Sequence, residues 1–254
     1  MICLWGCESE KPKHFDLIIV GGGASGTSAG LHASRNGIKT IILEPTEWLG
    51  GMLTAAGVSA IDGNHNLPSG IWGEFRDSLI GRYGSQSALA TGWVSHTLFE
   101  PSVAQQIFTN MTDREKNLEV RRMVSVDEVV EENGYWIVKT DDRNYKGKIL
   151  IDATELGDIA AMLEVPYEIG MQDGEDEPLG PSTPNKIIQD LTWVATLQDY
   201  GPDADKTIPK PANYDPTEFD CACNTGEPEI DAVDCEKMLD YGKLQGDKYM
   251  INWP

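Results

Sequence analysis

A glycine-rich turn between a predicted strand and a predicted helix constrains the fold of this chain most. The turn reads Gly21-Gly22-Gly23-Ala24-Ser25-Gly26, a G-x-G-x-x-G pattern. It follows the apolar run 15–20, which is typical of a buried parallel strand, and it opens a run of small residues at helical spacing over 24–36. A second apolar run, 38–43, ends at Glu44. The order strand, glycine turn, helix, strand predicts a right-handed βαβ unit.

Each glycine of this pattern has a physical task if the unit binds a dinucleotide. Gly21 permits the tight turn, Gly23 lets a pyrophosphate approach the backbone, and Gly26 lets the helix pack against the strands. The free N–H groups and the positive dipole end at the helix start stabilise phosphates. The carboxylate of Glu44 can accept hydrogen bonds from ribose hydroxyls. The alternative is a glycine-rich turn in an unrelated α/β protein, and the presence of all four elements argues against it.

A second glycine pair, Gly50-Gly51, follows Glu44 almost at once. Small residues there would let the backbone pass close to a cofactor that continues beyond the first strand. A flexible surface loop is the alternative. Together with the position of the first motif at the start of the domain, this pair favours FAD over NAD.

The rest of the sequence predicts further helices and strands, and its amino-acid composition changes towards the C-terminus. Residues 45–98 are rich in Gly, Ser and Trp, which predicts long loops. Asn133-Gly134 is a strong hairpin signal, and from about Gly170 Pro, Asp and Glu dominate. The expected helices are 72–80, 101–112 and 158–163, and the expected strands are 118–130, 135–140, 145–152, 192–197 and 249–254.

The chain resembles the FAD-dependent oxidoreductase family of two-dinucleotide-binding-domain flavoproteins, some of whose relatives are labelled xanthan lyase. The resemblance rests on 16–51 and, more narrowly, on Glu47-Trp48-Leu49-Gly50-Gly51-Met52-Leu53-Thr54. The stretches 99–104, 151–158 and 251–254 agree with it. The resemblance implies an α/β fold with a Rossmann-like FAD-binding domain, in which an antiparallel layer crosses a mainly parallel sheet in a three-layer arrangement.

The resemblance also implies a division of the chain. We expect a leader at 1–14, the FAD-binding domain at 15–169 and part of a mostly β substrate domain at 170–254, with the antiparallel layer formed by 118–148. The family continues beyond the Asn-Trp-Pro stretch at 252–254, so the chain is expected to be truncated inside its substrate domain.

Cofactor contacts carry over from the family residue by residue. The expected contacts are Gly21, Gly23, Ala24, Ser25 and Gly26 for the pyrophosphate, Glu44 for the adenosine ribose, Gly51 and Met52 for the ribityl or flavin side, backbone atoms of Val124 for the adenine, and Ala153 and Thr154 for a second contact stretch. That second stretch usually reads Ala-Thr-Gly in the family, and Glu155 stands at the position of its glycine.

The leading functional hypothesis is an FAD-dependent oxidoreductase that passes hydride between a small organic, sugar-related substrate and the flavin. One alternative is a truncated, catalytically incompetent nucleotide-binding fragment, and another is an NAD-dependent dehydrogenase. No catalytic acid or base can be named. His65 and His96 lie in the glycine-rich loops that could face the flavin, and solvated loop histidines are the alternative.

The net charge and the apolar content of the chain argue against several kinds of partner. A net charge of −21 argues against nucleic acid or an anionic membrane bound through bulk charge, and no stretch reaches the roughly 20 apolar residues of a transmembrane helix. Leu4-Trp5-Gly6-Cys7 resembles the end of a bacterial lipoprotein signal, so the expected location is the cytoplasm or, with Cys7 lipidated, the cell envelope. Cys221, Cys223 and Cys235 fit no zinc spacing, and they are either unpaired or include one disulfide.

Overall fold

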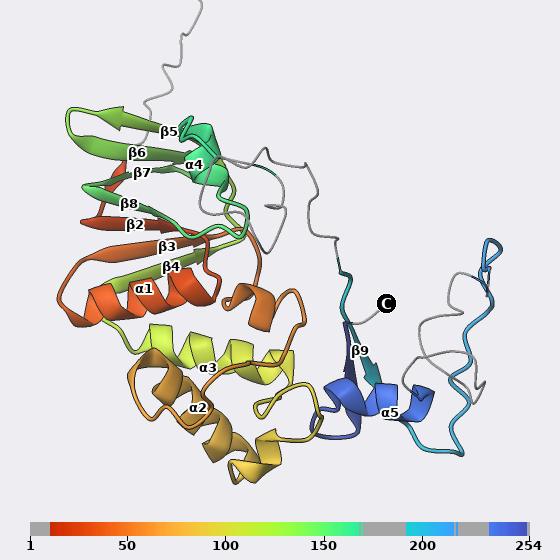
Figure 1. The fold of residues 1–254 in the computed structure, drawn as a ribbon. Coiled ribbons are helices and arrows are strands. Elements are labelled where there is room, and N and C mark those ends of the chain that lie inside the picture. Colours follow the sequence, from red (N-terminus) through yellow and green to blue (C-terminus); the bar gives the residue numbers. More distant parts are fainter. Residues whose placement is uncertain (1–10, 168, 170–191, 216, 218–233, 253–254) are drawn as a thin grey trace, which may run out of the picture.

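A four-stranded parallel sheet forms the centre of the protein. The computed structural model describes residues 11–167, 169, 192–215, 217 and 234–252. The central strands are β2 (Leu17–Val20), β3 (Thr40–Glu44), β4 (Leu118–Arg122) and β8 (Ile149–Asp152), in the spatial order β4-β3-β2-β8 with every neighbouring pair parallel. Figure 1 shows this sheet between a second sheet and a layer of helices.

The predicted βαβ unit is confirmed at the middle of this sheet. The strands β2 and β3 are buried along their whole length, as expected for strands covered on both faces. The helix α1 (Ala24–Arg35) connects them. It lies close to the sheet because Gly30 has no side chain: a Cβ there would be 2.6 Å from Cδ1 of Ile42.

The second sheet is mainly antiparallel. Its strands are β1 (Lys13–His14), β5 (Val126–Glu132), β6 (Tyr135–Thr140) and β7 (Asn144–Gly147), in the order β1-β7-β6-β5. The predicted hairpin between β5 and β6 is present, and Asn133 and Gly134 take the positive φ values of 52° and 74° that such a turn requires. The short strand β1 pairs in parallel with β7, so the segment that we expected to be a leader contributes a strand to this sheet.

Two expected strands are each divided between the two sheets, which corrects the sequence prediction. The segment 118–130 forms β4 in the parallel sheet and β5 in the antiparallel sheet, and 145–152 forms β7 and β8 in the same way. Met123 has a φ of 58° at the first break. This left-handed conformation ends the first strand and redirects the chain. The antiparallel layer predicted for 118–148 is therefore confined to β5, β6 and β7.

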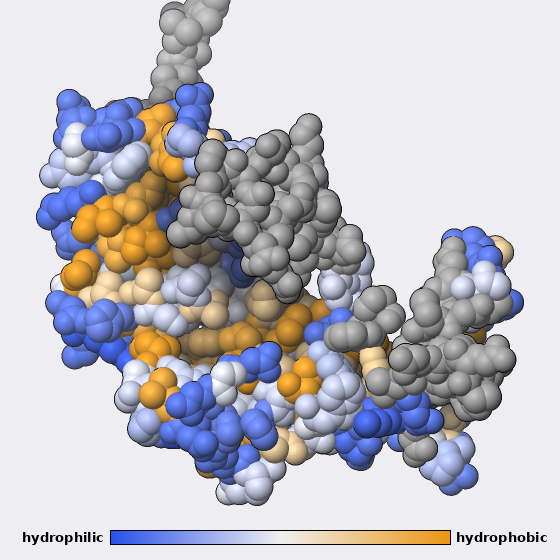
Figure 2. Space-filling model, in the orientation of Figure 1, coloured by the Kyte–Doolittle hydropathy of each residue, from blue (hydrophilic) through white to orange (hydrophobic). Residues whose placement is uncertain are grey.

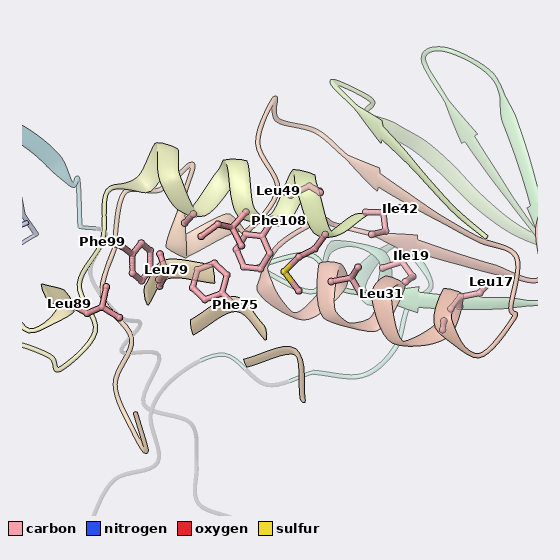
Figure 3. Close-up of a cluster of buried hydrophobic side chains, with 14 residues drawn as sticks. Leu17, Ile19, Leu31, Ile42, Leu49, Phe75, Leu79, Leu89, Phe99 and Phe108 are labelled. Carbon is pink, nitrogen blue, oxygen red and sulfur yellow. The ribbon is translucent and has the colours of Figure 1, made fainter. Parts of the chain in front are cut away.

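Two longer helices cover α1 on the side away from the sheets. These are α2 (Gly70–Tyr83) and α3 (Pro101–Asp113), close to the helices predicted at 72–80 and 101–112. Phe75 of α2 stacks on Phe108 of α3 with ring centroids 4.7 Å apart, and it meets Phe99 edge to face. Figure 3 shows these rings continuing into the side chains of α1 and the parallel sheet, so one apolar core joins the helices to the strands.

The last described segments form a small separate layer. The strands β9 (Ala195–Gln198) and β10 (Lys248–Ile251) pair in an antiparallel manner, near the strands predicted at 192–197 and 249–254. Leu98, Leu244 and Met250 form the core beneath them. The remaining short elements are η1 (Gly51–Leu53), η2 (Ser87–Leu89), α4 (Asp158–Met162), α5 (Cys235–Leu239) and η4 (Asp240–Gly242).

Some sequence predictions fall outside the described residues. Cys7, Cys221 and Cys223 belong to this group, and Cys235 begins α5. In the part of the chain that the structure describes, no helix is long and apolar enough to cross a membrane.

Candidate cofactor site

The carboxyl ends of the four parallel strands meet at one edge of the central sheet. Gly21 follows β2, Glu44 ends β3, Val124 lies shortly after β4, and Ala153 follows β8. Because these strands run in the same direction, residues far apart in the sequence come together there. Open α/β sheets bind their ligands in the crevice at this edge.

The glycine turn is locked against the end of β8. Gly21 has a φ of 95°, which favours glycine. A Cβ at Gly21 would clash with the carbonyl of Ala153, and one at Gly26 would clash with the carbonyl of Gly21. The N–H of Ala153 donates to the carbonyl of Val20 at 2.8 Å. Gly21 and Gly26 are therefore required by the packing of the turn itself.

Gly23 is buried at the start of α1 and differs from Gly21 and Gly26, because the atoms nearest to its Cβ position belong to a side chain and not to the backbone. It is the N-cap of the helix with a φ of −58°, which any residue can adopt. Among the described residues other than its chain neighbours, a Cβ there would meet the side chain of Glu155, at 2.8 Å from Oε1. The first turn of α1 holds no acidic residue, and its N-cap Gly23 has no side chain that could cap it. This arrangement fits a pyrophosphate, because uncapped N–H groups and the helix dipole attract anions and the absent Cβ leaves room for them.

Glu44 is fixed at the end of β3 by two backbone groups. It is only 6% exposed. Its Oε2 accepts from the N–H of Gly22 at 2.6 Å, and its Oε1 accepts from the N–H of Thr46 at 2.8 Å. Each carboxylate oxygen has a second lone-pair site, so the side chain retains acceptor capacity for ribose hydroxyls.

Val124 is attached to the same strand end through its backbone. Its N–H donates to the carbonyl of Glu44 at 3.1 Å, and its side chain is buried. With the N–H engaged in this way, a contact of Val124 with adenine would use its carbonyl as an acceptor.

The glycine pair Gly50-Gly51 lies beside the glycine turn. Gly50 forms a parallel bridge with Gly23, and its N–H donates to the carbonyl of Gly22 at 2.8 Å. A Cβ at Gly51 would be 3.0 Å from the Cα of Gly23. Met52 follows in η1 and is 55% exposed. Figure 2 shows apolar surface across the middle of this face, at the level of η1 and α3, with polar surface over α2 below it.

A hydrogen-bond network orders the loop between β8 and α4. Oδ1 of Asp152 accepts from the N–H and the hydroxyl of Thr154 at 2.9 and 2.7 Å, and Oδ2 accepts from the N–H of Ala160 at 2.8 Å. Burial opposes the ionisation of Asp152, but these hydrogen bonds favour the carboxylate more, so the pKa of Asp152 lies below its ordinary value. The network fixes Ala153 and Thr154 beside the glycine turn.

All the residues predicted to contact the cofactor therefore lie at or next to this edge. Ala24 and Ser25 form the first turn of α1. Sequence reasoning missed the roles of Gly22, Thr46 and Asp152, which hold the site together through backbone hydrogen bonds. Gly50 had a signal in the sequence as half of a glycine pair, and its φ of 109° accounts for it.

The histidines and tryptophans from residue 65 to residue 96 contact residues other than the predicted cofactor contacts. His65 and His96 pack against each other with ring centroids 4.4 Å apart. Trp93 donates to the carbonyl of Lys237 at 2.9 Å and packs on Tyr241, and Trp72 packs against the main core. Within the described ranges, no group of three or more His, Cys, Asp or Glu side chains is placed to hold a metal ion.

Comparison with known proteins adds a sequence match and structural similarities. The model of a family described as "FAD dependent oxidoreductase" matches residues 16–254. Among solved structures, the chain is similar to p-nitrophenol 4-monooxygenase from Pseudomonas putida DLL-E4, with 12% identity and a TM-score of 0.43, over 63% of this chain and 46% of that one. It is also similar to L-proline dehydrogenase from P. horikoshii, with 13% identity and a TM-score of 0.43, over 64% of this chain and 59% of that one.

A thioredoxin reductase from T. acidophilum is similar at 23% identity, with a TM-score of 0.36, over 55% of this chain and 35% of that one. The aligned part of the chain thus spans between 35% and 59% of the length of these three proteins.

Proposed function

The chain belongs to the FAD-dependent oxidoreductase family, and we propose that it passes hydride between a carbon atom of a small organic substrate and the flavin of FAD. The family match gives the cofactor as FAD and the general activity as redox catalysis. The small organic substrate and the hydride transfer are the parts that we add.

One observation carries the proposal. The start of α1, with Gly23 as its N-cap, lies beside Gly51 at the carboxyl edge of a parallel sheet. The described atom nearest to a Cβ at either glycine is Oε1 of Glu155, which belongs to an exposed residue. A dinucleotide needs this combination, since its pyrophosphate requires both N–H donors and a close approach to the backbone. The adjoining buried carboxylate of Glu44 supplies the acceptor that ribose hydroxyls require.

In this proposal, different residues of the chain bind different parts of the cofactor. The N–H groups of Ala24, Ser25 and Gly26 bind the pyrophosphate. Glu44 accepts from the ribose, and the carbonyl of Val124 accepts from the adenine amine.

On the other side of the glycine turn, Gly51 and Met52 border the ribityl chain and the flavin. Ala153 and Thr154, held by Asp152, close the site from β8. FAD, when bound, supplies the group that accepts or donates hydride. The protein positions it and excludes water from its surroundings.

The substrate is tested by anaerobic mixing of the FAD-loaded chain with candidate reductants. Polyols and sugar acids are the first class to test, because the resemblance is to a family common in sugar-utilising species, and amino acids serve as the comparison class. Reduction would bleach the visible flavin absorbance, and mass spectrometry would show a product two hydrogens lighter. A chain that dithionite bleaches but no organic reductant of either class bleaches would contradict the proposed hydride transfer from such a substrate.

A further inference from the structure

The side chain of Glu155 lies between the glycine turn, at Gly23, and the glycine pair, at Gly51. A Cβ on Gly23 would lie 2.8 Å from Oε1 of Glu155, and a Cβ on Gly51 would clash with the same oxygen. Apart from Gly23 itself and its two chain neighbours, no other atom of the described residues comes within 4 Å of the Cβ position at Gly23. The described group nearest to this position is therefore a carboxylate.

Few groups of the described residues hold this carboxylate in place. Glu155 is an exposed residue, and among the described residues its carboxylate accepts no hydrogen bond and forms no ion pair. It follows the ordered Thr154 and precedes Gly157, whose φ is 73°. The favourable interaction available to it is with the positive end of the α1 dipole, which also attracts phosphate.

The two neighbouring carboxylates already accept hydrogen bonds from other groups. Glu44 accepts from Gly22 and Thr46 at the end of β3, and Asp152 accepts from Thr154 and Ala160 behind the loop. A phosphate that enters thus meets the carboxylate of Glu155, which has no hydrogen-bond partner among the described residues, in front of two hydrogen-bonded carboxylates.

We propose that Glu155 sets the affinity of the site for FAD by competing with the diphosphate for the start of α1. Its side chain turns outward when the diphosphate enters, and its charge remains close enough to repel the phosphates. The inference rests on the proposed function, since it takes FAD as the ligand. It assigns to Glu155 a role opposite to that of Glu44, although both carboxylates border the same glycine turn.

Titrations of the cofactor-free chain with FAD and with ADP test this proposal. The variants are Glu155→Gln, which removes the charge and keeps the size, and Glu155→Ala, which removes both. Glu131→Gln, at an exposed position of β5, is the matched control for net charge. Dissociation constants are measured from flavin fluorescence for FAD and by calorimetry for ADP, at low and at high salt.

The expected result is a dissociation constant about three- to tenfold lower for E155Q than for the wild-type chain at low salt, because removing a like charge near the surface changes binding by roughly this much. E155A should bind at least as tightly as E155Q, and E131Q should match the wild type. The difference should shrink at high salt, which screens exposed charges.

Three results would overturn the inference and leave the proposed function standing. In the first, E155Q binds FAD no more tightly than the wild type. In the second, E155Q or E155A binds FAD more weakly, which would show that the carboxylate holds the cofactor. In the third, the gain appears with FAD but not with ADP, which would move the action of Glu155 from the diphosphate to the flavin side. FAD binding by none of the chains would instead contradict the proposed function.

Discussion

At the residue scale, glycines with similar conformations have different tasks. Gly21 and Gly37 both have positive φ, at 95° and 82°. A Cβ at Gly21 would clash with the backbone of Ala153, whereas one at Gly37 would meet nothing within 4 Å. The two positions therefore separate the strain of a left-handed alanine from the loss of close packing at the site.

We expect Gly21→Ala to destabilise the protein by about 3 kcal/mol or more and to abolish FAD binding, because strain and a backbone clash add together. Gly37→Ala should cost only about 1 kcal/mol and leave FAD binding intact. Denaturant unfolding and the FAD content of the purified variants measure both effects. Equal stability and equal FAD content in the two variants would contradict the account of the turn.

Glu44 gives a second prediction at this scale. In Glu44→Gln the amide can accept through one atom only, so the N–H of Gly22 or that of Thr46 loses its partner. We expect a loss of about 1–3 kcal/mol in stability and weaker FAD binding. The control is Glu47→Gln at an exposed position nearby. Unchanged stability and affinity in E44Q would show that this carboxylate does not organise the site.

Individual residues also show how far the sequence could predict the site. Gly21, Gly26 and Glu44 follow from one local pattern, so their positions at the ends of β2 and β3 and in the first turn of α1 could be predicted. The direction of the Glu155 side chain could not, because it depends on the β8–α4 loop and on the bridge between Gly23 and Gly50. That bridge joins segments whose contact no local pattern encodes.

At the scale of elements, the Asp152 network determines how β8 passes into α4. The folded-state pKa of Asp152 lies below its ordinary value of 3.8. Its ionised form therefore adds stability that is fully present above that value and is lost as the pH falls through the folded pKa.

We expect Asp152→Asn to cost about 1–2 kcal/mol at neutral pH, because its amide NH₂ cannot accept from the N–H of Ala160. The gap between the two proteins should narrow as the pH falls below about 4. Denaturant unfolding across this range measures the gap, with Asp127→Asn at an exposed position of β5 as the control. A gap that stays constant down to the lowest pH would contradict the assigned role of the ionised carboxylate.

The expected strands 118–130 and 145–152 show that hydrophobic periodicity does not predict where a chain passes from one sheet to another. Both halves of each segment alternate as strands do, so the pattern predicts strand throughout. Where the chain leaves one sheet for the other depends on single residues such as Met123, whose positive φ is uncommon for a residue with a side chain.

At the scale of the whole molecule, contacts of β10 are among those that join the last described segments to the rest. Met250, only 1% exposed, packs with Leu98 and Leu244, and its sulfur accepts from the N–H of Ser59 at 3.2 Å. Lys248 forms an ion pair with Glu100 at the start of α3. These contacts lie away from the glycine turn, so the two regions should respond separately to mutation.

We expect Met250→Ala to cost about 2–4 kcal/mol in the layer that holds β9 and β10. Hydrogen exchange should quicken in those strands while FAD content stays unchanged. Met162→Ala, at an exposed position of α4, should change neither. A parallel loss of FAD in M250A would show that the cofactor site depends on this layer.

The central claim is that the space in front of Gly23 holds the diphosphate of FAD. It is tested most directly by the visible spectrum and the released cofactor of the wild-type chain and of Gly23→Ala. The added Cβ meets no backbone atom and the φ of −58° suits alanine, so the variant should fold as well as the wild type. We expect a yellow wild-type chain that releases one FAD per chain and a folded, colourless variant. A folded wild-type chain that neither contains nor takes up FAD, or a variant that retains FAD equally well, would contradict the account.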